Sequence, residues 1–228
     1  MHTEPPTQTA THPVTQIGNR LRHLRLQRSM SLRTLAGMLG ISASALSQLE
    51  TGRRSPSLER LHQIVAALDY PLNAVFDDDS GRDENPHAGE EERFPGQTSE
   101  DLAGVIIQRA LQAPAVILAG NIEWTAAAPM QVSGLDLLRV TYPAGAQPAE
   151  PVTHTGVEIV HVVQGTLRFE VGDERSELSN GDSIMYNAKT PHRISNPTKE
   201  PASAIWTVIE GTCQLRPAQH PPNHGEVG

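Results

Sequence analysis

The sequence predicts an α + β chain of two domains, an all-α helical bundle followed by an all-β barrel. Apolar residues recur at helical spacing within residues 15–77, whereas from residue 102 onward short Val- and Ile-rich runs alternate with turn residues. Residues 78–101 between these regions are acidic and contain Gly and Pro, which is typical of a linker. The length of 228 residues suits two domains of ordinary size.

Composition restricts the environment in which we expect the chain to work. The single cysteine, Cys213, has no partner for an internal disulfide, so a reducing compartment is natural. The N-terminus lacks the basic and apolar blocks of a signal peptide, and no apolar run is long enough to cross a membrane. We therefore expect a cytoplasmic protein without a membrane partner. Residues 1–14 and 213–228 are rich in Pro, Thr, His and Gly, and we expect them to be disordered tails.

Residues 31–56 are typical of two helices joined by a tight turn. Ser31 and Ser42 are suited to cap the two helices, and Gly40 between them is suited to end the first. Helical patterns over residues 15–28 and 58–68, and a short turn over 72–76, complete the expected bundle. The two inner helices each have an apolar face at helical spacing, formed by Leu35, Ala36 and Leu39 on the first and by Ala45, Leu46 and Leu49 on the second.

This region resembles the lambda-repressor-like, XRE-type helix-turn-helix domain over residues 15–77. The resemblance implies binding to a double-stranded DNA operator, with the second helix in the major groove. One departure lies at Leu32, where members of the family often carry Gln. The matching positions are Leu35-Ala36, Leu39-Gly40-Ile41-Ser42, Leu46-Ser47, Glu50, Gly52, Arg53 and Pro56.

The charge distribution agrees with DNA binding. Residues 17–68 carry a net charge of +6 although the whole chain carries −8. A positive module on an acidic chain is the pattern that contact with phosphates needs. The arginines concerned cluster at Arg20, Arg22, Arg25, Arg28 and Arg33, and again at Arg53 and Arg54.

Helix geometry selects candidates for reading the bases, because the first turn of the second helix points into the groove. The amide of Gln48 can pair with two atoms of adenine; the alternative is an ordinary solvated glutamine. Ser44 and Ser47 can contact a base or a phosphate, and Ala43 can contact a thymine methyl group. The full set of predicted DNA-binding residues is Arg33, Ala43, Ser44, Ser47, Gln48, Arg53 and Arg54.

The C-terminal half is typical of an antiparallel barrel or jelly roll. Its runs are seven to nine residues long and are bounded by Gly, Pro, Asn or Asp, without an intervening helical pattern. The expected strands are GVIIQRA (104–110), PAVILAG (114–120), LDLLRVTY (135–142), VEIVHVVQG (157–165), TLRFEVG (166–172), DSIMYNA (182–188) and AIWTVIEG (204–211).

Two segments of this half resemble the two motifs of the cupin family, and the resemblance covers residues 102–212. It implies a jelly-roll barrel with a site at its mouth. Gly165 and the Gly181-Asp182 pair match hairpin positions that need unusual backbone angles. The matching residues are His154, Glu158 and Gly165 in the first motif and Gly181, Asp182, Pro191, His192 and Asn196 in the second.

The cupin resemblance implies a reduced metal site. Val152 stands where full cupin sites have their first histidine, which leaves His154, Glu158 and His192. Two imidazoles and a carboxylate suit Fe(II), Zn(II) or Mn(II) with open positions for water or a ligand. The alternative is a sensory cupin that has lost its metal. His161 is expected to be a packing residue.

The two resemblances together match the XRE–cupin transcription regulators of bacteria. They imply a homodimer joined through the cupin domains, with a small-molecule or metal effector in the barrel. Hydroxypropylphosphonate epoxidase has the same order of domains and a similar iron site, so an iron-dependent oxygenase is the alternative. The presence of Gln48, Arg53, Arg54 and the local positive charge favours the regulator, because an enzyme does not need them.

Overall fold

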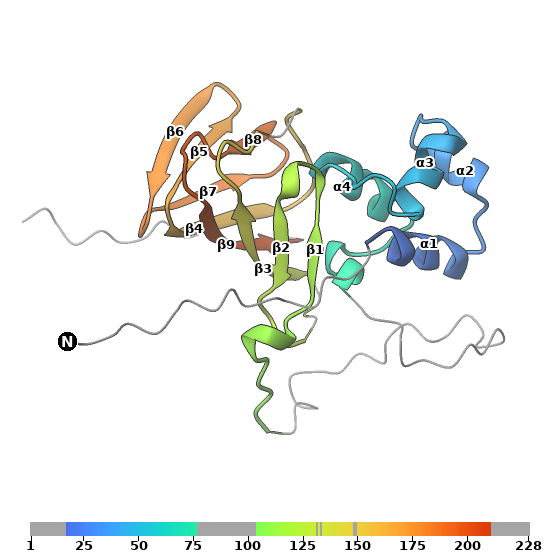
Figure 1. The fold of residues 1–228 in the computed structure, drawn as a ribbon, viewed down its shortest axis with the longest axis horizontal. Coiled ribbons are helices and arrows are strands. Elements are labelled where there is room, and N and C mark those ends of the chain that lie inside the picture. The colour runs from blue at the N-terminus through green and yellow to red at the C-terminus, as the bar shows by residue number, and fades with distance from the viewer. Residues whose placement is uncertain (1–16, 77–103, 131, 133, 148–149, 211–228) are drawn as a thin grey trace, which may run out of the picture.

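The computed structural model describes residues 17–76, 104–130, 132, 134–147 and 150–210 (Figure 1). The predictions for residues 1–14, 78–101 and 213–228, including Cys213, lie outside the described residues. A helical part and a β-sheet part lie side by side, with α4 between the sheet and the rest of the helices. The α + β class with an N-terminal bundle is therefore confirmed. No helix among the described residues is long and apolar enough to cross a membrane.

The helical part has the five elements that the sequence predicts, with bounds within about two residues of the prediction. Four of them are α-helices and the last is a 3-10 helix. They are α1 (Ile17–Gln27), α2 (Leu32–Met38), α3 (Ala43–Glu50), α4 (Leu58–Ala67) and η1 (Leu72–Phe76).

Serine side chains begin three of these helices. The hydroxyl of Ser31 accepts a hydrogen bond from the backbone N–H of Thr34, and that of Ser42 accepts one from Ala45. Ser57 does the same at the start of α4. Each hydroxyl satisfies an amide that has no partner within its helix. Gly40 adopts a φ of 64° in the turn, where a residue with a side chain would be strained.

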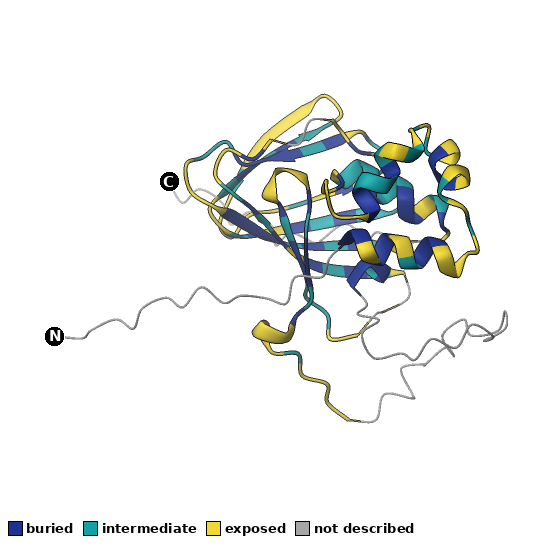
Figure 2. Cartoon of the chain, turned by 45° about the vertical axis from the view of Figure 1, so that its right-hand side comes forward, coloured by how far each residue is buried: buried dark blue, intermediate teal, exposed yellow. Residues whose placement is uncertain are grey.

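Buried leucines hold the helices together, with the polar residues outside (Figure 2). A close approach also joins α1 to α3, because a Cβ atom on Gly18 would lie 2.3 Å from the carbonyl oxygen of Leu49. The fully buried side chains of this core are Leu21, Leu24, Leu35, Leu46, Leu61, Ile64, Leu68 and Val75.

The β part consists of two antiparallel sheets. A six-stranded sheet has the order β1-β2-β3-β9-β4-β7, and a three-stranded sheet has the order β6-β5-β8. Their inner faces enclose a core that contains Leu167, Phe169 and Ile194. The strands are β1 (Ala115–Ile117), β2 (Glu123–Ala126), β3 (Leu135–Tyr142), β4 (Val157–Gln164), β5 (Thr166–Val171), β6 (Glu174–Ser179), β7 (Ser183–Asn187), β8 (His192–Ser195) and β9 (Ala202–Ile209).

The strand predictions were right for the apolar runs and wrong at four places. The sequence pattern does not predict β2, β6 and β8, which are short or rich in polar residues. The segment over residues 104–110, where the pattern predicts a strand, is not a strand, and Val105, Ile106 and Ile107 are exposed there. The described part of the chain pairs no strand with this segment, so its β-type composition alone does not make one.

The glycines of the second half lie at the predicted turns. Gly165 has a φ of 73° between β4 and β5, and a Cβ atom there would lie 2.9 Å from the side chain of Ala202. Gly181 has a φ of 94° in the turn before β7, where the Asp182 carboxylate accepts the backbone N–H of Ser179. These contacts fix the register of the strands that carry the candidate site.

The helical and β parts also contact each other directly. The backbone N–H of Ala119, next to β1, donates to the carbonyl oxygen of Pro56, just before α4, over 2.9 Å. Asp136 on β3 accepts a hydrogen bond from the backbone N–H of Asn73 in η1. The helical part therefore contacts the β part through the segment just before α4 and through η1.

Candidate DNA-binding face and cupin site

The predicted DNA-binding residues are all at least partly exposed, on α2, on α3 and in the segment after α3. Ser44 is exposed in the first turn of α3, and Ala43, Ser47 and Gln48 are partly exposed along the same helix. Arg53 and Arg54 are exposed directly after α3, while Arg33 is exposed on α2. α2 and α3 lie on the far side of α4 from the sheet (Figure 1). The individual contacts of these residues with DNA remain predictions.

Three of the arginines that make the helical part positively charged have partners within it. Arg25 is buried and pairs with Glu50, and Arg20 is buried and donates from Nε to the carbonyl oxygen of Ala74. Arg28 donates to the carbonyl oxygen of Leu68 and lies over the ring of Tyr70. The guanidinium groups of Arg20, Arg25 and Arg28 therefore have partners within the protein, and none of the three belongs to the predicted DNA-binding residues.

The three predicted metal ligands are brought together in the β part. His154 lies in the loop before β4, Glu158 lies on β4, and His192 begins β8. The Glu158 Oε1 atom lies 2.8 Å from His154 Nε2 and 3.7 Å from His192 Nε2. One ligand atom from each residue lies within 4.8 Å of the others. The antiparallel pairing of β4 with β7 and of β5 with β8 produces this meeting of distant residues.

Hydrogen bonds orient both imidazoles toward the carboxylate. The Nδ1 atom of His154 contacts the carbonyl oxygen of Thr155, and Nδ1 of His192 contacts that of Thr190, both at 2.9 Å. A carbonyl oxygen can only accept, so each Nδ1 carries the proton and each Nε2 faces the centre. Backbone partners of this kind orient metal-bound histidines in proteins.

The second carboxylate oxygen of Glu158 is also held by neighbours. Its Oε2 atom accepts hydrogen bonds from Trp206 Nε1 at 2.9 Å and from the hydroxyl of Tyr186. The carboxylate is thereby fixed with Oε1 directed at the two histidines. The donor set of two imidazole nitrogens and one fixed carboxylate oxygen suits Fe(II), Zn(II) or Mn(II).

The electrostatics of the site favour an ionised carboxylate at Glu158. Burial alone would raise the pKa of Glu158, but hydrogen bonds from His154 and Tyr186 and the nearby imidazoles lower it to about 2. Burial lowers the pKa of His154, yet the hydrogen bond and charge of Glu158 outweigh this and raise it. Burial dominates at His192 and lowers its pKa. A divalent ion would compete with protons for these ligand atoms, so its affinity would depend on pH.

Val152 occupies a structural position in place of a ligand. Its backbone N–H and carbonyl oxygen form two hydrogen bonds with His192, at 2.8 and 3.0 Å, and its side chain is buried. This bridge holds β8 beside the first motif. His161, expected to be a packing residue, is exposed and contacts the Ser183 hydroxyl, away from the site.

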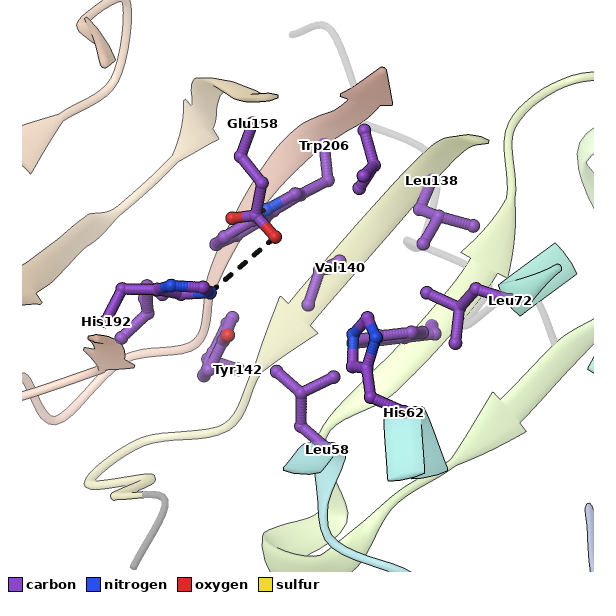
Figure 3. Close-up of a pocket in the computed structure, with 12 residues that line it drawn as sticks. Leu58, His62, Leu72, Leu138, Val140, Tyr142, Glu158, His192 and Trp206 are labelled. Atoms are coloured by element: carbon purple, nitrogen blue, oxygen red, sulfur yellow. Dashed lines mark hydrogen bonds and ion pairs between the residues drawn. The ribbon is translucent and has the colours of Figure 1, made fainter. Parts of the chain in front are cut away.

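A pocket leads to Glu158 and His192, and the helical part supplies one of its walls (Figure 3). Leu58 and His62 come from α4 and Leu72 comes from η1. His62 is not among the predicted site residues, because a single histidine in a helix gives no signal of its contact with the distant His154. The other lining residues are Trp124, Leu138, Val140, Tyr142, Glu158, His192, Ile194, Trp206 and Val208.

Comparison with known proteins gives matches for both parts of the chain. A helix-turn-helix family model matches residues 21–75, and a cupin domain family model matches residues 138–208. The HTH-type transcriptional regulator PuuR of Escherichia coli (strain K12) is 24% identical over 179 residues, which are 78% of this chain and 86% of that protein. A transcriptional regulator in the ATPase CF(0) region of Rhodospirillum rubrum is 33% identical over 75 residues, which are 33% of this chain and 69% of that protein.

The chain also aligns with solved structures over most of its length. The crystal structure of an HTH_3 family transcriptional regulator from Vibrio cholerae aligns with a TM-score of 0.57 and 25% identity, over 86% of this chain and 96% of that one. Fe(II) hydroxypropylphosphonic acid epoxidase aligns with a TM-score of 0.40 and 20% identity, over 86% of this chain and 98% of that one, which is too distant to argue for its activity.

Proposed function

The chain belongs to the helix-turn-helix transcriptional regulators that carry a C-terminal cupin domain, and we propose that it binds its operator as a homodimer controlled by an effector in the cupin site. The observation that carries this proposal is the exposure of α3, on which Gln48 is partly exposed and after which Arg53 and Arg54 are exposed. The relatives named above are regulators, which supports this role over an oxygenase.

On DNA, we assign Gln48, Ser44, Ser47 and Ala43 to the base edges of the major groove. Arg33, Arg53 and Arg54 are assigned to the phosphate backbone, because they are exposed on α2 and directly after α3. Phosphate contacts supply affinity and register, whereas Gln48 supplies preference for adenine.

The homodimer is supported by an exposed apolar segment before β1. Val105, Ile107 and Leu111 are 88%, 63% and 60% exposed, which is costly for three neighbouring apolar side chains. The segment has the composition of a strand but no strand partner in the described part of the chain. We assign a second copy of this chain as its partner, which would place two α3 helices on two half-sites.

The effector is assigned to the pocket at Glu158. His154, Glu158 and His192 would hold a divalent ion, and the ion would supply positive charge and open coordination positions for a ligand. Without a metal, the apolar walls suit a small organic molecule whose polar group approaches the same three residues.

DNA selected from random sequences by the full-length protein tests the function. We expect a two-fold symmetric site, specific binding in the nanomolar range or tighter, and a log affinity that falls linearly with log salt. Failure to enrich any sequence, together with weak binding that is the same for all DNA, would contradict the proposal.

A further inference from the structure

One side of the cupin pocket is built by the DNA-binding part of the chain. Leu58 and His62 project from α4 toward the pocket, opposite Glu158 and His192 (Figure 3). The imidazole of His62 lies parallel to that of His154, with ring centroids 4.3 Å apart and planes inclined by 10°. The same ring meets Trp124 edge-on at 6.4 Å.

These contacts close the pocket. The space left inside admits little more than a water-sized molecule, and Glu158 and His192 are 5% and 1% exposed. An ion fits beneath this cover. An organic molecule of several heavy atoms does not, so its entry requires α4 to move.

A movement of α4 also moves the recognition helix. α4 shares the helical core through Leu61 and Ile64, and Arg60 donates to the carbonyl oxygen of Leu39 at the end of α2. Only residues 51–57 separate α3 from α4. Packed cores move as units, so the helices follow α4 together.

We propose that α4 is the lid of the cupin site, so that access to the site and the placement of the DNA-binding helices are one equilibrium. The regulatory role of this lid rests on the proposed function. In the closed state, contacts through His62 hold each recognition helix at a fixed place on its barrel, and a dimer then meets two half-sites at a fixed spacing. A ligand too large for the closed pocket binds only the open state, in which the spacing of the two recognition helices is no longer fixed.

The backbone amide of Ala119 reports lid opening directly. Its hydrogen bond goes to Pro56, so the bond exists only while the two parts of the chain are in contact. Hydrogen exchange at this amide, measured by NMR on the full-length protein, gives the population of the open state. Amides of the β3–β9 ladder, which are hydrogen-bonded within the sheet and not to the helical part, report global unfolding in the same experiment.

Two substitutions at one position separate stacking from other effects. His62→Ala removes the ring, and we expect exchange at Ala119 to become about fivefold faster while the β3–β9 amides stay unchanged, since an aromatic pair is worth about that factor. His62→Phe keeps a ring against His154 and should restore the slow rate. Gln63→Ala changes the next residue of α4, which pairs with Glu59 outside the pocket, and should leave the rate unchanged.

The second experiment measures hydrogen exchange in the presence of the selected DNA, which carries two half-sites. If DNA with two half-sites binds the closed state more tightly than the open state, it must slow hydrogen exchange at the Ala119 amide. DNA with a single half-site should not slow this exchange. An Ala119 rate that is insensitive both to His62→Ala and to two-half-site DNA would overturn the lid, even if the protein binds DNA as proposed. Failure to bind any selected DNA would instead overturn the proposed function, while the His62 variants alone would still decide whether α4 is a lid.

Discussion

The guanidinium group of Arg25 lies against the carboxylate of Glu50, with Nε and Nη2 each donating to a separate oxygen at 2.6 and 2.7 Å. Both side chains are less than 10% exposed. The glutamate lowers the cost of burying the arginine and raises its pKa, while a further bond runs from Nη1 to the carbonyl oxygen of Met30. The pair joins α1 to the C-terminal end of the recognition helix.

Breaking this pair should destabilise the helical part strongly. Glu50→Ala leaves the Arg25 charge buried without its partner, which costs about 3–5 kcal/mol in the free energy of unfolding. Urea denaturation followed by circular dichroism measures the change. Glu59→Ala removes a glutamate that is more accessible and should cost less than about 1 kcal/mol. Equal losses for the two variants would contradict a special role for the buried pair.

Replacement of Gln48 tests base reading. Gln48→Ala should weaken binding to the selected operator by about 1–3 kcal/mol and relax preference at one position of each half-site. Binding to unrelated DNA should not change, because phosphate contacts carry it. Fluorescence anisotropy with both DNAs measures this. Gln27→Ala, an exposed glutamine at the end of α1, is the control, and equal loss on both DNAs would remove Gln48 as a base reader.

Metal content tests the cupin site. Protein loaded with Fe(II), Zn(II) or Mn(II) and then desalted should retain about one ion per chain, and His154→Ala should lower the affinity by at least about 100-fold. Elemental analysis gives the stoichiometry. His161→Ala, which changes an exposed histidine outside the site, should bind as the wild type does. A wild-type protein that retains no ion would leave the organic effector as the sole candidate.

Asp136 should make stability depend on pH between about 4 and 6. Burial and the nearby Glu210 raise its pKa from 3.8 to about 6, against the opposing hydrogen bond from Asn73. The folded state therefore binds a proton at pH values where the unfolded state has lost it, so this residue stabilises the fold as pH falls through 6 and costs stability above it.

Comparison with a neutral variant isolates this contribution. Asp136→Asn should be more stable than the wild type at pH 8, and the difference should shrink as the pH falls toward 4. Urea denaturation at several pH values measures it, with Asp173→Asn on the exposed turn before β6 as the control. A difference that grows on acidification would contradict the assigned sign.

The exposed segment before β1 should be part of the dimer interface. Ile107→Glu places a charge where we expect a second chain, and the protein should become monomeric at micromolar concentration. Leu26→Glu changes an apolar residue of comparable exposure on α1 and should not alter the mass. Light scattering after size-exclusion chromatography distinguishes the outcomes, and a dimer that survives Ile107→Glu would place the interface elsewhere.

The sequence predicted what depends on local chemistry. Serine caps, the turn at Gly40 and the apolar runs of β3, β4 and β9 are encoded within a few residues, and all lie where expected. β6 was missed because its residues are exposed and polar, and it is held by pairing with β5.

The candidate site was predictable only in part, because some of its contacts join residues that are far apart in the sequence. The triad follows from two motifs, but the contact of His62 with His154 depends on how two parts of the chain pack. Arg25 likewise reads as a surface charge until its partner Glu50 is known.

The two-sided packing of α4 limits how freely these two domains can be exchanged between proteins. One side of the helix completes the bundle through Leu61, Ile64 and Val65, while Leu58 and His62 complete the pocket. A chimera joined within residues 78–101 would therefore combine a foreign α4 with a barrel that it was not shaped to cover. The functional boundary runs along the surface of this helix, and an engineered sensor would need Leu58, His62 and Leu72 transferred together with the barrel.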